Sequence, residues 1–100
     1  MPSNNGLLVR IEARAEHAEE VAALLTGALD AARAEEGTVT WFAFREGPTV
    51  FGIFDTFADE AGRVAHLEGP IAAALMEVVP RLLASEPSIR VVDILAAKPA

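Results

Sequence analysis

The chain has 100 residues, of which 52% are hydrophobic and 23% are charged, and its 8 basic and 15 acidic side chains give a formal net charge of −7 at pH 7. This length fits one compact domain, and the hydrophobic content is high enough to fold around a core. The acidic balance excludes nucleic acid as an expected partner, because binding to a phosphate backbone depends on clustered Lys and Arg.

The chain contains no cysteine, which excludes disulfides, thiolate metal sites and a cysteine nucleophile. Its first five residues carry no positive charge and lead into no long apolar run, so we expect neither a signal peptide nor a membrane span. These features predict a soluble, cytoplasmic protein without a membrane partner. We expect a single domain over residues 1–100, with flexible tails at 1–5 and 97–100.

The first two predicted elements are a strand and a long helix. Residues 7–14 alternate between apolar and polar side chains, which is typical of a strand with one buried face. Residues 16–36 carry apolar side chains at helical spacing and acidic residues in the first turn, and Gly37 can end the helix. This pattern predicts one continuous helix.

Two strands are predicted next, at 39–45 and 50–57. Both segments are rich in β-branched and aromatic residues. The break at Gly47-Pro48 between them predicts a hairpin turn.

Two helices and a last strand complete the chain. Asp59 is the predicted N-cap of a short helix that runs to Leu67. Pro70 suits the first turn of the following helix, whereas Pro80 should kink or end it. Residues 88–95 are the fourth predicted strand.

The order β-α-β-β-α-β predicts an α+β fold of the ferredoxin-like split type, a four-stranded antiparallel sheet with helices on one face. The strands at 39–45 and 50–57 are apolar on both sides, so the face without helices would expose a large apolar patch. We therefore expect a homodimer, a dimeric α+β barrel with two sheets packed face to face about a two-fold axis. Arg10 and Glu12 lie on that side, either as ion pairs in or near the interface or at a solvated edge.

The two histidines are the only side chains whose ordinary pKa suits proton transfer near neutral pH. His17 lies in an acidic first helical turn, three residues before Glu20. A bare pair at this spacing is interpreted as solvated surface.

His66 falls on a helical wheel opposite Ala61, Val64 and Ala65, which form the predicted core stripe of its helix. One interpretation is therefore a surface histidine stabilised by the helix C-terminus. The other is a residue that borders a ligand site, because Gly62 on the same side has no side chain to block an approach.

Trp41 and Asp55 are the other notable side chains of the predicted sheet. Trp41, the only tryptophan, is most simply explained as core packing. Asp55 stands among Phe54 and Phe57, so it must find a partner, reach water at a sheet edge, or take a raised pKa that suits a general base. An ion pair with an arginine is the ordinary outcome.

From residue 7 to about residue 95, the chain resembles the antibiotic biosynthesis monooxygenase family of small dimeric α+β barrels. The resemblance rests on the element order, on the segment FGIFDTFADEA at 51–61, on Ala65-His66, and on the following helix that ends with Leu82-Leu83. It implies an oxygenase that uses no metal, flavin or haem. The quinol or phenolic substrate is deprotonated in a dry cavity between sheet and helices and itself passes an electron to oxygen.

Several family residues are replaced in this chain. Ile53 and Phe57 stand where antibiotic-type members have an asparagine and a tryptophan, and the chain has no tyrosine. The asparagine and tryptophan of haem-degrading members are also missing, which argues against haem degradation. Only His66 carries over.

The sequence therefore predicts a cofactor-independent monooxygenase that acts on a small aromatic or quinol-like molecule and O2, with no metal site. We expect His66 to be the proton acceptor or a hydrogen-bond partner of the substrate, and Asp55 or Arg45 to orient the substrate or His66. The alternative is a non-catalytic dimer that binds a small apolar ligand or serves as a structural module. The residues expected to shape the cavity are Trp41, Phe54 and Phe57.

Overall fold

The element order of the chain, seen in a computed structural model that describes residues 4–98, is the predicted β-α-β-β-α-β, with both helical regions divided in two. No helix among these residues is long and apolar enough to cross a membrane. The elements are β1 (Asn5–Glu12), a 3-10 turn (Ala15–His17), α1 (Ala18–Gly27), α2 (Leu29–Arg33), β2 (Thr38–Arg45), β3 (Val50–Phe57), α3 (Glu60–Leu67), α4 (Pro70–Leu82) and β4 (Ser88–Asp93).

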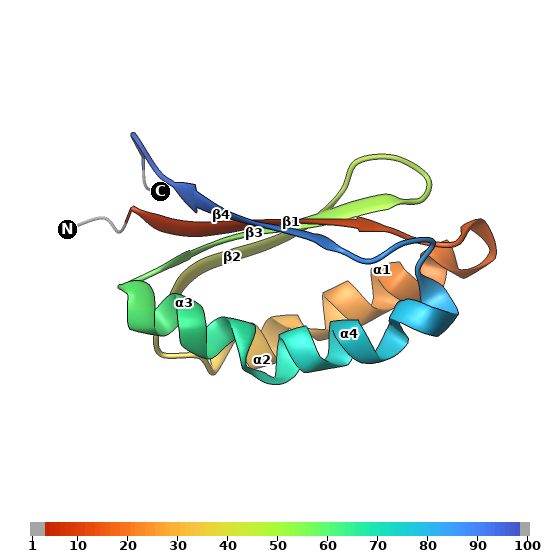
Figure 1. The fold of residues 1–100 in the computed structure, drawn as a ribbon, viewed down its shortest axis with the longest axis horizontal. Coiled ribbons are helices and arrows are strands. Elements are labelled where there is room, and N and C mark those ends of the chain that lie inside the picture. Colours follow the sequence, from red (N-terminus) through yellow and green to blue (C-terminus); the bar gives the residue numbers. More distant parts are fainter. Residues whose placement is uncertain (1–3, 99–100) are drawn as a thin grey trace.

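The four strands form one antiparallel sheet in the order β2-β3-β1-β4, which confirms the predicted fold class. Figure 1 shows α1 to α4 on one face of this sheet and no helix on the other. In the central pair, Leu7 lies opposite Asp55 and Ile11 opposite Phe51, and all four side chains are buried under the helices. The side chain of Asp55 is thus placed inside the core by a strand that is otherwise apolar on this face.

Several element bounds differ from the prediction. Asn5, expected in a flexible tail, pairs with Phe57 and Asp93 in the sheet. The predicted tails at 1–3 and 99–100 lie outside the described residues. The helix expected over 16–36 is interrupted at Ala28, because the hydroxyl of Thr26 donates to the Ala22 carbonyl, a contact that bends helices.

The caps of the second helical region follow the prediction. Asp59 is the N-cap of α3, and its Oδ1 accepts a hydrogen bond of 2.8 Å from the Gly62 N–H. Pro70 occupies the first turn of α4. Pro80 lies inside α4, which ends two residues later at Leu82, and Arg14 Nη2 donates to the Pro80 carbonyl.

The prediction of which side of α3 faces the core was wrong. The helical wheel placed Ala61, Val64 and Ala65 in the core, but all three are exposed. A helical wheel ranks residues by hydrophobicity alone. In α3, the buried polar side chains are stabilised by polar partners, and a glycine lets the helix approach the neighbouring backbone closely. The buried residues of α3 are Gly62, Arg63 and His66.

Two glycines allow this close approach. A Cβ built on Gly62 would lie 2.8 Å from the Gly37 carbonyl oxygen and 3.2 Å from the Gly37 Cα. The neighbouring Arg63 is buried, donates to the Gly6 carbonyl, and forms an ion pair with Glu60. The glycine contact therefore brings α3 against the segment just before β2.

The uncovered side of the sheet, here termed the open face, is apolar as predicted. Phe42 is 58% exposed, Phe44 is 41% exposed and Leu8 is 38% exposed. Phe54 lies on this face too, opposite Phe42 in the register. Arg10 is exposed beside these side chains and lies 3.7 Å from Glu46 of the hairpin turn.

Candidate functional site

His66, in the last turn of α3, is the centre of a buried charged cluster. Its Nδ1 lies 2.6 Å from Glu35 Oε1, and its Nε2 lies 2.9 Å from Asp55 Oδ2. The first contact is a hydrogen bond, whereas the second is an ion pair without aligned hydrogen-bond geometry. His66 is 6% exposed and Asp55 is wholly buried, so three separate elements of the chain bring these charges together in the interior.

The two carboxylates control the protonation of His66. Burial by itself lowers the pKa of His66, because it disfavours the charged imidazolium. The contacts with Asp55 and Glu35 outweigh burial, so the pKa of His66 lies above its ordinary value of 6.5. The two carboxylates thus favour the protonated form of His66.

This arrangement changes the chemistry open to His66. In its protonated form, with both ring nitrogens facing carboxylates, His66 has no free lone pair and accepts no further proton. Asp55 and Glu35 still have acceptor atoms. Both Asp55 Oδ1 and Glu35 Oε2 are buried without a hydrogen-bond partner in the described part of the chain. When His66 is protonated, the atoms of this cluster that can accept a proton are the carboxylate oxygens.

A third unpartnered polar atom belongs to the same region. Trp41 lies opposite Asp55 in the β2–β3 register, on the helix-facing side of the sheet, and its Nε1 is buried without a partner. The indole also packs against the hydrophobic core, as the sequence suggested. Trp41 therefore combines a packing role with an unused hydrogen-bond donor.

Two open grooves meet near this cluster. The His66 groove has a volume of about 370 Å³ and lies between the segment 35–38 and the junction of α3 and α4. The β2 groove has a volume of about 240 Å³ and lies between α2 and the first half of β2, with Trp41 in its wall. Thr38 lines both, so the two grooves adjoin at this residue.

A smaller apolar pocket between the sheet and α4 also touches His66, but its volume is about 40 Å³. That space is roughly enough for one small molecule such as water and far below the 150 Å³ or so of a cavity that holds benzene. An aromatic ring therefore does not fit in this small pocket between the sheet and α4.

The structure brings some of the predicted site residues together. Asp55 is paired with His66 rather than with the arginine expected from the sequence. The rings of Phe57 and His66 have centroids 5.2 Å apart. Trp41 completes this group through its position opposite Asp55.

Phe54 and Arg45 lie elsewhere. Phe54 is on the open face, because successive strand residues point to opposite sides and its neighbour Asp55 points inward. Arg45 is four residues along β2 from Trp41, about 13 Å at the ordinary strand rise.

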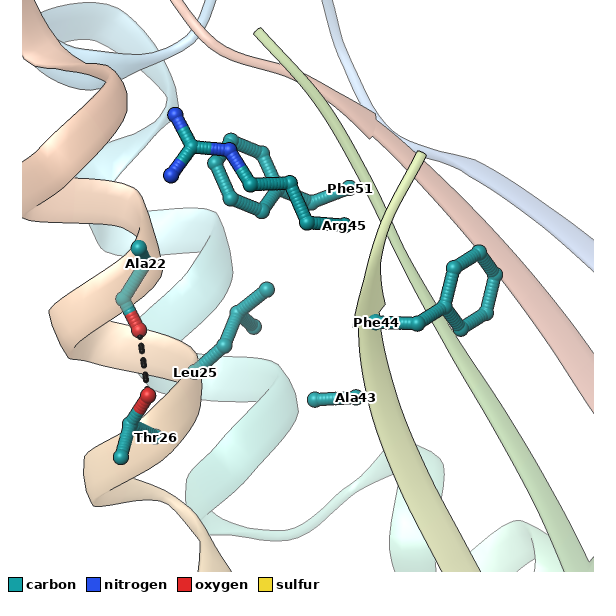
Figure 2. Close-up of a pocket in the computed structure, with 7 residues that line it drawn as sticks. All are labelled: Ala22, Leu25, Thr26, Ala43, Phe44, Arg45 and Phe51. Atoms are coloured by element: carbon teal, nitrogen blue, oxygen red, sulfur yellow. Dashed lines mark hydrogen bonds between the residues drawn. The ribbon is translucent and has the colours of Figure 1, made fainter. Parts of the chain in front are cut away.

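Figure 2 shows Arg45 above the Phe51 ring, in a separate pocket of about 200 Å³ near the hairpin. Its guanidinium forms a 2.8 Å ion pair with Glu19. The same view shows Phe44 pointing away from the helices. Arg45 is thus bound to Glu19 and Phe51 near the hairpin and contacts neither His66 nor Asp55.

Glu35 is the site residue that the sequence reading missed. It lies between α2 and β2, thirty-one positions before His66 in the chain. Its neighbour Glu36 has the same chemistry, and nothing local distinguishes the two. The available signal was Gly37, since a glycine that admits another backbone marks the place where α3 contacts this segment.

His17, the other histidine, is partly exposed, and its Nδ1 lies 2.7 Å from Glu20, in keeping with its interpretation as a surface residue. Among residues 4–98, no group of three or more His, Cys, Asp or Glu side chains is arranged to hold a metal ion.

No family model matches the sequence, and no curated protein matches it. Among solved structures, a protein of unknown function from Nitrosomonas europaea is 52% identical, with a TM-score of 0.94 and coverage of 98% of this chain and 96% of that one. A candidate antibiotic biosynthesis monooxygenase from Deinococcus radiodurans is 20% identical, with a TM-score of 0.83 and coverage of 96% and 97%. A Mycobacterium tuberculosis protein is 18% identical, with a TM-score of 0.84 and coverage of 95% and 98%.

Proposed function

The chain belongs to the family of the Nitrosomonas europaea protein of unknown function and has the fold of candidate antibiotic biosynthesis monooxygenases, and from this premise we propose that it is a cofactor-independent monooxygenase. Its substrate is a small aromatic or quinol-like molecule. The substrate binds in the depression formed by the His66 groove and the β2 groove, outside the packed core.

One observation carries this proposal: a buried histidine held between two carboxylates, beside an open groove large enough for an aromatic ring. The groove volume of about 370 Å³ falls within the range of roughly 300–1,000 Å³ that is common for small-molecule sites. Buried titratable groups whose environment shifts their pKa are concentrated at functional sites. The cluster thus supplies proton acceptors next to a place for the substrate.

The reaction needs the protein to remove a proton and to stabilise negative charge. A carboxylate of the cluster accepts a proton from the substrate. The nearby imidazolium then stabilises the negative charge that this transfer leaves on the substrate. With an anthrone, a methylene group becomes a carbonyl: one oxygen atom of O2 enters the product and the other leaves as water. The methylene carbon supplies all four electrons, so the reaction balances without an external reductant.

Oxygen uptake tests this proposal. With anthrone or menadiol under air, the wild type should consume O2 well above the protein-free rate, and His66→Ala should lower that excess by about 10²-fold, the lower range for loss of one group that stabilises developing charge. His17→Ala is the matched control, because His17 is a partly exposed histidine outside the site, and its rate should equal that of the wild type.

Equal, slow uptake by the wild type and His66→Ala would contradict the enzyme proposal. It would favour the second candidate function, a protein that binds a small ligand without converting it. One observation points to that function: Ile53 and Phe57, which replace the family's asparagine and tryptophan, are buried apolar residues that donate no hydrogen bond.

The second part of the proposal is a homodimer formed through the open face. The sheet has three strands of eight residues and a fourth of six. At the ordinary rise per residue and the ordinary spacing between strands, the backbone of one sheet face covers about 500 Å², to which the side chains add further area. This area approaches the roughly 800 Å² per partner of a stable interface. A second copy is the fitting occupant, because an apolar sheet face is complementary to another of the same shape.

Light scattering at micromolar concentration should therefore give about twice the chain mass of 10.6 kDa. Phe42→Asp should shift the protein toward the monomer, because it places a charge on the apolar face. Val64→Asp is the control, since Val64 is 43% exposed on α3, in the helical layer. A monomeric wild type, or equal behaviour of both variants, would contradict the dimer.

A further inference from the structure

A separate pocket, here termed the Arg45 pocket, lies between α1 and the last residues of β2, and the residues that line it are those labelled in Figure 2. Its volume of about 200 Å³ exceeds the roughly 150 Å³ of a cavity that holds benzene. None of its lining residues lines the His66 groove or the β2 groove. A ligand bound here would therefore be independent of the proposed oxygenase site.

The side walls of the Arg45 pocket are apolar. Ala43 lies opposite the buried Ile53 in the register and so points toward the helices, yet it is exposed. Across the gap from Ala43, Figure 2 shows Ala22 and Leu25 of α1. The hydroxyl of Thr26 donates to the Ala22 carbonyl at 2.8 Å, so its hydrogen is already used within the helix. These walls suit an apolar group of a ligand.

Arg45 forms the polar end of the pocket, and several contacts hold its guanidinium in place. Its Nε donates to the Gly47 carbonyl at 3.3 Å, and its Nη2 donates to the Pro48 carbonyl at 2.8 Å. The guanidinium carbon lies 4.9 Å from the centre of the Phe51 ring. Within the described part of the chain, the N–H groups of Nη1 make no hydrogen bond. The guanidinium is thus oriented by the hairpin and still has donors to offer.

Glu19 shows what this guanidinium binds. Its Oε2 accepts a 2.8 Å hydrogen bond from Arg45 Nη2, and this contact lowers the pKa of Glu19 below its ordinary value of 4.5. The Glu19 side chain is 82% exposed, and exposed ion pairs contribute little to stability. Another carboxylate can therefore replace Glu19 at small cost, because the exchange keeps a charge pair on Arg45.

We propose that the Arg45 pocket binds a small monocarboxylic acid, with its carboxylate on Arg45 in place of Glu19 and its apolar tail between α1 and β2. A planar guanidinium suits this headgroup, because two parallel N–H groups can meet the two carboxylate oxygens. Of the described residues that line the pocket, only Arg45 carries a charge, which matches a ligand with a single negative charge. The net charge of −7 disfavours anions of higher charge, such as phosphate esters.

The test titrates the wild-type protein with hexanoate and, separately, with acetate and hexan-1-ol, and follows the NMR signals of the Arg45 Nε–H and the Ala43 methyl group. Acetate has the same headgroup without the apolar tail, whereas hexan-1-ol has the tail without the charge. We expect hexanoate to move both signals in a saturable way and to bind about fivefold or more tightly than either control compound. If acetate or hexan-1-ol binds as tightly as hexanoate, the proposal is wrong, since the headgroup or the tail then contributes nothing.

Two variants should change the affinity in opposite directions. Glu19→Gln removes the carboxylate that competes for Arg45, so hexanoate should bind about two- to fivefold more tightly. Arg45→Gln removes the guanidinium and should abolish the preference for hexanoate over hexan-1-ol. Glu77→Gln is the matched control, because it removes the same charge from an exposed residue of α4 outside the pocket. Its affinity for hexanoate should equal that of the wild type, since distant surface charges are screened at ordinary salt.

The comparison of Glu19→Gln with Glu77→Gln remains decisive if Arg45→Gln does not fold. Tighter binding by Glu19→Gln alone would support displacement of Glu19 by the ligand. Equal affinities of these two variants would overturn the proposal, because a change in net charge would then account for any gain.

Discussion

His66→Ala is expected to lower the free energy of unfolding by about 3–5 kcal/mol. Removal of one partner leaves a buried charge uncompensated, and here the wholly buried Asp55 loses the imidazolium 2.9 Å away. Chemical denaturation at one fixed protein concentration measures the effect, because a dimer's stability depends on concentration. His17→Ala, at a partly exposed ion pair, should change stability by less than about 1 kcal/mol.

The cost of His66→Ala should also depend on pH. Because the folded-state pKa of His66 is raised above 6.5, its charge contributes stability that is fully present below about pH 6.5 and is lost as the pH rises through the folded-state pKa. The difference between wild type and His66→Ala should therefore be larger at pH 6 than at pH 9. A difference that does not change with pH would mean that His66 binds its proton equally well in the folded and unfolded states, so that folding does not raise its pKa.

Gly62→Ala is expected to destabilise the protein by about 1–3 kcal/mol or more, although alanine is the better helix former. The added Cβ would lie 2.8 Å from the Gly37 carbonyl oxygen, and this neighbour is backbone that cannot rotate away. The helix α3 would have to shift, carrying His66 with it. The same denaturation experiment measures the loss.

Gly27→Ala is the matched control, since Gly27 is also a helical glycine but no atom lies within 4 Å of its added Cβ. It should stabilise the protein by about 0.5–1 kcal/mol, the ordinary gain from glycine to alanine in a helix. Similar effects of the two substitutions would show that the contact between Gly62 and Gly37 is not tight.

The sequence singled out those residues of the candidate site that carry a local signal. Asp55 stood out because a carboxylate in an apolar strand needs a partner, and His66 because few side chains titrate near neutral pH. Their contact could not be read from the sequence, since it depends on how α3 is rotated against the sheet. The wheel of α3 gave the opposite rotation, because it treats Arg63 and His66 as outward-facing residues.

The role of Glu35 and the position of the grooves could not be predicted from the sequence either, because both depend on contacts between distant parts of the chain. A glutamate at the end of a helix is ordinarily solvated, and its burial follows from the contact of Gly37 with Gly62. The space between the sheet and α4 is nearly filled, since α4 packs closely on β1 and β3. The open volume lies instead at the edge of β2.

The amino-acid sequence by itself determined the elements, their order and the antiparallel sheet, because periodicity, caps and turn residues act within a few positions along the chain. Only the tertiary structure decided that Glu35, His66 and Asp55 form one cluster and that Trp41 offers a free N–H beside it. Such contacts join residues far apart in the chain. They exist because two glycine backbones let a helix approach closely enough to bury its polar side.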